Sequence, residues 1–110
     1  MALLPAGGIV LRSEMEALFL VFIDERGLPQ PEINQEVEGF EVDCVWRRER
    51  IALELDSRGF HDNAIAYERD RERDRVLNAA DWHPVRVTWR QLTQTPAAVE
   101  RDLRRMLAPR

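Results

Sequence analysis

Two neighbouring segments that alternate between apolar and polar residues constrain the fold of this chain more than any other feature. Successive side chains of a strand point to opposite faces, so FEVDCVW and IALELDS each predict a strand with one apolar face. The polar residues RRER between them predict the loop of a β-hairpin. The polar faces carry four carboxylates, Glu41 and Asp43 on the first strand and Glu54 and Asp56 on the second.

The hairpin register sets acid against acid. If Trp46 pairs with Ile51, Asp43 lies opposite Glu54, and the next two acids also oppose each other. Like charges directly opposed in a sheet cost up to about 1 kcal/mol per pair. A magnesium ion reverses the sign, because it needs closely spaced carboxylate oxygens and keeps other positions for water and phosphate. The alternative is a solvated face of an edge hairpin, but the apolar run IALEL favours a central strand.

Composition limits the size and the partners of the protein. A chain of 110 residues predicts one domain, and we expect residues 12–110 to form it, with residues 1–11 as a tail or the remnant of a linker. That tail is too short and too broken by proline and glycine to span a membrane. The single cysteine, Cys44, lies on an apolar face and predicts a reduced core thiol, which fits a cytoplasmic protein. The net charge of −4 argues against binding nucleic acid by charge alone.

The first helix is expected to run from Ser13 to about Arg26, before Gly27 and Pro29. Ser13 would be its N-cap, and Glu16 three residues later would complete a capping box. Glu16 also lies at the edge of the apolar face, where it could reach an underlying sheet, and the cap and the site explain it equally well. That apolar face is formed by Met15, Phe19, Phe22 and Ile23.

The remaining pattern predicts an α/β fold, with a mixed sheet of about four strands flanked by helices in the order α-β-β-β-α-β-α. Beyond the first helix and the acidic hairpin, it consists of a strand near residues 33–38 with a turn at Gly39, a helix after the N-cap Asn63, a strand at residues 83–88, a turn at TWRQL, and a last helix opened by Thr95 and Pro96.

The helix after Asn63 contains ERDRERDR, in which every i, i+4 pair repels by about 0.2 to 0.5 kcal/mol. A helical projection puts Arg69 and Arg73 on its buried side. An inward arginine needs a carboxylate, such as Asp70 or the acidic strands, or a ligand phosphate. For Arg69 we favour a structural ion pair. The same buried side carries Ile65, Val76, Leu77 and Ala80.

His61 follows Asp56 by five residues, in the loop after the second acidic strand. A histidine there can transfer a proton, or hold a phosphate or water beside a metal ion. The alternative is ordinary polar surface.

These residues resemble a known group of enzymes. One acidic helix residue, an aspartate on a strand, and Glu-x-Asp on the next strand are arranged as in the PD-(D/E)XK nuclease superfamily. The string ELDSRGFH, the spacing D-x-x-R-x-x-x-L and the string VRVTW are similar to the branch near the very-short-patch-repair endonucleases, the bacterial domain-of-unknown-function family 559. The resemblance covers residues 12–92.

The resemblance implies a single restriction-endonuclease-like domain that cuts DNA with magnesium, or with manganese in its place. By position, Glu16 matches the helix acid, Asp43 the metal-bridging aspartate and Glu54 the second metal ligand. Asp56 stands where the superfamily usually has lysine, and His61 matches the histidine of the branch.

One residue departs from the family pattern. Ser57 replaces the glycine that usually follows Glu-x-Asp. If that position needs a positive φ or a close approach to the phosphate, a serine impairs catalysis. The sequence therefore predicts a magnesium-dependent endonuclease of DNA. The alternative is a catalytically impaired nuclease-fold module that binds DNA or a partner, for example in a repair or toxin-antitoxin system.

Overall fold

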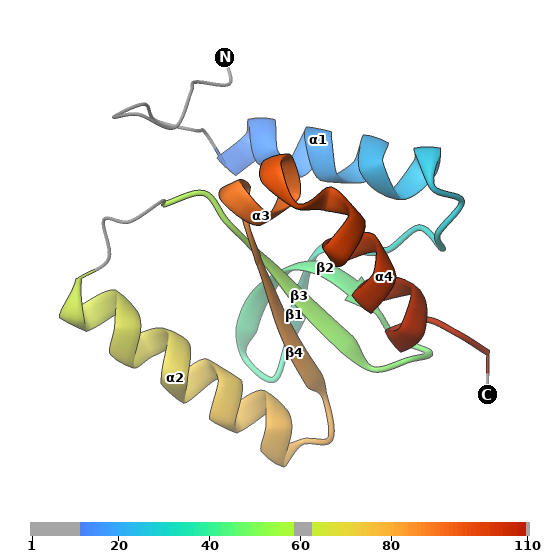
Figure 1. The fold of residues 1–110 in the computed structure, drawn as a ribbon. Helices are drawn as coiled ribbons and strands as arrows, with labels where there is room; N and C mark the ends of the chain where they lie inside the picture. The colour runs from blue at the N-terminus through green and yellow to red at the C-terminus, as the bar shows by residue number, and fades with distance from the viewer. Residues whose placement is uncertain (1–11, 59–62, 110) are drawn as a thin grey trace. The chain divides into compact units, whose positions relative to one another are not determined.

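The computed structural model describes residues 12–58 and 63–109, and its elements follow the predicted order, with two helices in the last position (Figure 1). Among the described residues, no helix is long and apolar enough to cross a membrane. The helices are α1 (Arg12–Glu25), α2 (Ala64–Ala79), α3 (Trp89–Gln94) and α4 (Pro96–Met106), and the strands are β1 (Glu32–Val37), β2 (Phe40–Trp46), β3 (Ile51–Asp56) and β4 (His83–Thr88).

The four strands form one sheet in the order β1-β2-β3-β4. The pairs β1–β2 and β2–β3 are antiparallel. The strands β3 and β4 start next to each other, as shown by the hydrogen bond of 2.8 Å from the backbone N–H of His83 to the carbonyl of Arg50. The sheet is therefore mixed. The prediction of an α/β fold with a mixed four-stranded sheet is confirmed. Because β2 and β3 are the central strands, the alternative of a solvated edge hairpin is wrong.

The register of the central hairpin is the one predicted. Trp46 pairs with Ile51, and two further pairs continue toward the middle of the sheet. One more step along this register sets Asp43 opposite Glu54. Cys44 is fully buried, as predicted, and forms no disulfide within the described residues.

Backbone contacts divide the chain into two compact units. One contains β1, β2, α2 and the larger parts of β3 and β4, residues 31–54 and 63–86. The other contains α1, α3, α4 and the last residues of β3 and β4, residues 12–30, 55–58 and 87–109.

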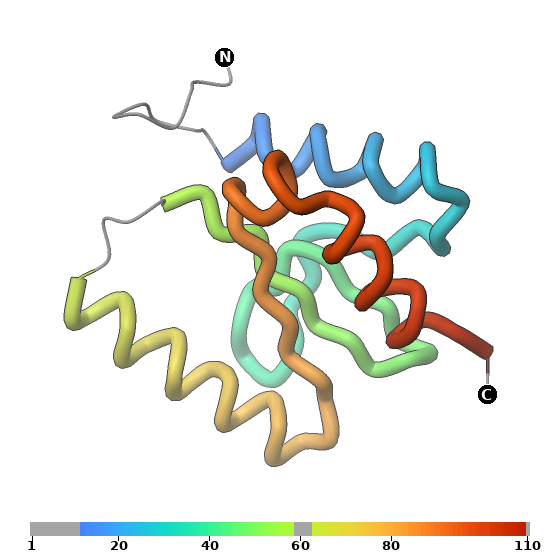
Figure 2. Tube along the Cα trace, viewed as in Figure 1, coloured from blue at the N-terminus to red at the C-terminus, as the bar shows by residue number. Residues whose placement is uncertain are grey.

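In the first unit, α2 begins as predicted at the N-cap Asn63, whose Oδ1 accepts from the N–H of Ala66 at 2.8 Å. At its other end the chain reverses directly into β4 (Figure 2). Arg50 from the central hairpin donates to two carbonyls of this reversal, at 2.8 and 3.0 Å, and lies 4.6 Å from the Trp82 ring. These contacts satisfy carbonyls that a helix end leaves without partners. The core of the unit comprises Val37, Val42, Val45, Ala52, Leu77 and Trp82.

The predicted buried side of α2 is correct only toward its C-terminus. Leu77 is 1% exposed and the Arg73 side chain 12%, whereas Arg69 is exposed and Ile65 is 74% exposed. The prediction that Ile65 and Arg69 face inward is therefore wrong. A helical projection gives the direction of a side chain, but its depth depends on how far the helix continues to contact its neighbours.

In the second unit, the predicted apolar face of α1 is confirmed, since all four of its residues are buried. The helix ends as predicted, with Gly27 at φ 65° and its N–H donating to the carbonyl of Asp24 at 3.1 Å. Its start differs. Arg12 is already helical, so Ser13 lies inside the first turn, and the predicted capping box of Ser13 and Glu16 is wrong. Helix ends are the part of an element that local sequence defines least.

The segment TWRQL forms the start of α3, and the prediction of a turn there is wrong. The hydroxyl of Thr88 accepts from the N–H of Gln91, and the Gln91 side chain accepts from the N–H of Thr88, both at 3.0 Å. This capping box has the spacing T-x-x-Q and starts a helix directly after β4. The last helix, α4, begins at Pro96, as predicted.

The turn between β1 and β2 offers a test of backbone strain. Val37 pairs with Phe40, and the two residues between them, Glu38 and Gly39, have φ of 51° and 83°. Such a turn favours asparagine at its first position, because glutamate is strained at positive φ. We expect Glu38→Asn to stabilise the protein by about 0.5 to 1 kcal/mol, measured as a higher urea midpoint. Glu49→Asn removes the same charge from a residue without a positive φ, and equal midpoints in the two variants would contradict the strain argument.

Candidate functional site

Asp43 occupies the middle of β2 and is 2% exposed. Among the described residues it is the one buried side chain that is polar or charged. Burying a carboxylate is costly unless hydrogen bonds or opposite charge offset it. A chain selected for stability alone would place an apolar residue here, so the position marks a candidate site.

Glu54 presents its carboxylate to the same place from β3, with its side chain 18% exposed. Its Oε2 accepts a long hydrogen bond, 3.4 Å, from the backbone N–H of Asp43. Its Oε1 has no hydrogen-bond partner among the described residues. Because none of these residues leaves a fully buried side-chain oxygen unpartnered, this Oε1 is not completely enclosed by the described residues. One oxygen of Glu54 is thus held by the protein, and the other is available to a ligand.

Arg73 supplies the positive charge at this site from α2. Its Nη2 donates to Oε2 of Glu54 at 2.6 Å and to the backbone carbonyl of Glu41 at 2.9 Å. The prediction that Arg73 points inward is confirmed, and of the partners left open for it, the acidic strands supply Glu54. One nitrogen therefore joins α2 to both central strands beside the two acids.

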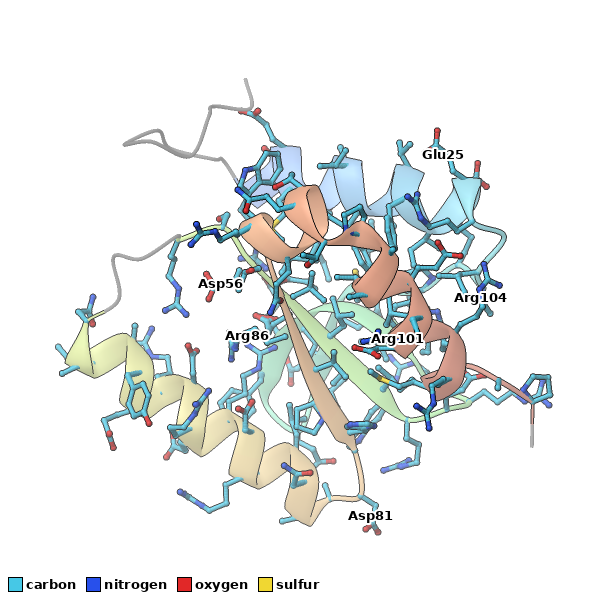
Figure 3. The ribbon with its side chains drawn as sticks, in the orientation of Figure 1. Glu25, Asp56, Asp81, Arg86, Arg101 and Arg104 are labelled. Carbon is cyan, nitrogen blue, oxygen red and sulfur yellow. The ribbon has the colours of Figure 1, made fainter. Side chains whose placement is uncertain are left out.

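The alternative partner proposed for Arg73, Asp70, binds elsewhere. Arg86 on β4 lies 3.6 Å from Asp70 and 3.9 Å from Asp74, and its side chain extends toward α2 (Figure 3). Arg86 is not among the functional residues predicted from the sequence. The available signal was its place between Val85 and Val87, which puts an arginine on the opposite face of the strand from its neighbours.

The pKa of Glu54 is raised from 4.5 to about 7, first by burial of the carboxyl group and second by the nearby charge of Asp43. The charge and hydrogen bond of Arg73 act in the opposite direction without cancelling the effect. Near neutral pH the pair therefore resists holding two negative charges. A divalent cation would relieve that repulsion.

The other predicted site residues are described separately from this cluster. Glu16 and Asp56 belong to the second compact unit, where Glu16 is half-buried on α1. Asp56, labelled in Figure 3, forms two hydrogen bonds with the Arg58 guanidinium, at 3.0 and 3.1 Å. Arg69 is exposed on α2, and His61 lies outside the described residues.

Two carboxylates limit which metal ion this site can hold. Among residues 12–58 and 63–109, no group of three or more histidine, cysteine or acidic side chains could hold a metal ion. Zinc sites need three or four such ligands. Magnesium is commonly held by one or two carboxylates and completes its shell with water and substrate phosphate. The donor set of Asp43 and Glu54 therefore fits magnesium.

Comparison with solved structures defines the class of fold. The chain is similar to the catalytic domain of the homing endonuclease I-Bth0305I, with a TM-score of 0.64 over 81% of this chain and 89% of that one, at 13% identity. The two share a restriction-endonuclease-like fold. The restriction-endonuclease-like family model REase_MTES_1575 matches residues 16–107, and the chain belongs to this family. No curated protein matches.

Proposed function

We propose that the protein is a metal-dependent endonuclease that hydrolyses phosphodiester bonds in DNA, with Asp43 and Glu54 as magnesium ligands. The observation that carries the proposal is the buried Asp43 beside Glu54, whose Oε1 has no hydrogen-bond partner among the described residues. Membership of a restriction-endonuclease-like family supports it. The protein would act in the bacterial cytoplasm, which suits its reduced core cysteine.

A magnesium ion held there would polarise a phosphoryl oxygen and lower the pKa of a bound water. The protein would contribute by holding the two ligands, Asp43 and Glu54, in position. Asp43 lies on a central strand with neighbours on both sides, so its backbone is held in place by the sheet. Glu54 offers Oε1 while its other oxygen is held. Manganese, with similar ligand preferences, would substitute.

Three further residues enter the proposal from the sequence. Glu16 and Asp56 would position metal or water, and His61 would assist proton transfer. Substitution of each by its amide or by alanine tests these roles through the rate of cleavage. The narrower likeness to the very-short-patch-repair branch and to family 559 is likewise a proposal, and a preference for mismatched duplexes would support it.

A non-catalytic module that binds DNA or a partner is the alternative function, and the sequence feature that favours it is Ser57 in place of the family glycine. The described non-glycine residues with positive φ are Asn34, Glu38, Arg50 and Asp81. Ser57 is not among them, so serine is not strained there by a left-handed backbone. The conformational argument for an impaired enzyme is therefore removed.

Cleavage assays with and without chelator distinguish the two functions. Purified protein is incubated with supercoiled plasmid and with flapped and mismatched duplexes, with magnesium, manganese or EDTA. We expect nicking with either metal and none with EDTA. DNA binding that is equal with and without EDTA, together with no cleavage under any condition, would favour the non-catalytic module. Cutting that persists in EDTA would contradict metal dependence.

A further inference from the structure

Arg73 contacts one particular oxygen of the Glu54 carboxylate, whereas charge attraction alone does not require a choice between the two oxygens. The guanidinium meets only Oε2, the oxygen that also faces the backbone N–H of Asp43. The same Nη2 also donates to the backbone carbonyl of Glu41, so the guanidinium is held by the main chain of β2 as well as by Glu54. The side chains of Arg73 and Glu54 are 12% and 18% exposed, which leaves little room for other rotamers.

We propose that Arg73 is a positioning residue, which holds Oε2 of Glu54 so that Oε1 is the oxygen offered to the metal ion. This inference rests on the function proposed above. Groups that orient a metal-binding carboxylate raise metal affinity, because the ligand does not have to be ordered when the ion binds. Arg73 would therefore act on the metal through Glu54, without contact with the ion.

If Arg73 had only a structural role, its removal would change the metal affinity in the opposite direction. Its positive charge beside the carboxylates competes with a divalent cation for the same negative charge. If charge balance were its only role, removing it would make magnesium bind more tightly. If it orients Glu54, removing it makes magnesium bind more weakly. The sign of the change in metal affinity separates the two.

The experiment measures magnesium and manganese binding to the full chain by calorimetry, without DNA. We expect Arg73→Gln to weaken binding by about 10- to 100-fold, the usual effect of losing a partner that orients a metal ligand. Arg73→Lys keeps the positive charge but loses the planar fork, so it should also weaken binding, by a smaller factor. If Arg73→Gln does not fold, the metal affinity of Arg73→Lys still tests the positioning role. Metal binding by Arg73→Gln as tight as wild type or tighter, or full wild-type affinity in Arg73→Lys, would overturn the positioning role.

Arg86→Gln is the matched control, because Arg86 is also a partly buried arginine that faces two carboxylates. It should leave the metal affinity unchanged. Equal losses in Arg86→Gln and Arg73→Gln would mean a general effect on the unit, and would also overturn the proposal. If wild type neither binds metal nor cuts DNA, the proposed function itself fails. If wild type does both and only the Arg73 variants behave contrary to expectation, the positioning role alone fails.

Discussion

Asp43→Asn and Glu54→Gln are each expected to lower the rate of DNA cleavage by about a thousandfold or more. Each change removes one of the two carboxylates that would hold the metal ion. A bound metal ion contributes several kcal/mol of transition-state stabilisation, and each 1.4 kcal/mol is about a factor of ten in rate. Both replacements are close in shape to the original side chains, so the circular dichroism spectrum should be retained.

The measurement is the initial rate of plasmid nicking in magnesium, compared with the folded fraction of each variant. Glu41→Gln is the control, because Glu41 is an acid of the same strand, two residues from Asp43, but exposed. It should cut at nearly the wild-type rate. Wild-type rates in both Asp43→Asn and Glu54→Gln would exclude these two residues from the mechanism.

The acid pair could be predicted from the sequence because it depends on two local rules. A period of two assigns each side chain to a face, and a four-residue loop fixes which residues of the two strands meet. The pairing of Trp46 with Ile51 follows from these rules, and Glu54 then comes to lie beside Asp43. The inward direction of Arg73 follows from the helical period in the same way.

Features that depend on distant parts of the chain could not be predicted in this way. The helical period treats Arg69 and Arg73 alike, but contact with the sheet reaches Arg73 and leaves Arg69 exposed. The pairing of Arg86 with α2 depends on where β4 joins the sheet. The sequence pattern does not predict the helix α3, for another reason. Its T-x-x-Q capping box was present in the sequence but lies inside a segment that also resembles the end of a strand.

The second large effect concerns stability in the absence of metal and DNA. Because the pKa of Glu54 is raised from 4.5 to about 7, the folded state holds the proton more tightly than the unfolded state does. The stabilisation that comes from protonating Glu54 is therefore fully present below pH 4.5 and is lost as pH rises through 7. The shift corresponds to about 3 kcal/mol in total, of which about 1 kcal/mol is recovered between pH 8 and pH 6. The melting temperature in EDTA should therefore rise by several degrees when the pH is lowered from 8 to 6.

Asp43→Asn tests whether the acid pair causes this behaviour. The variant removes the repulsion from Asp43 but leaves Glu54 buried beside Arg73. We expect it to melt at a higher temperature than wild type at pH 8 in EDTA, and to gain less on acidification to pH 6. Comparing variant with wild type at each pH cancels the groups that titrate equally in both.

Magnesium should reverse the order of stability of the two proteins. For a site with a dissociation constant of about 1 mM, 10 mM magnesium stabilises the folded state by about 1.4 kcal/mol, or several degrees in a domain of this size. Wild type should show this response at pH 8 and a weaker one at pH 6, where a proton on Glu54 competes with the ion. Asp43→Asn should lose most of it at both pH values. A variant that melts below wild type in EDTA, and gains as much from magnesium, would show that these two carboxylates do not form the metal site.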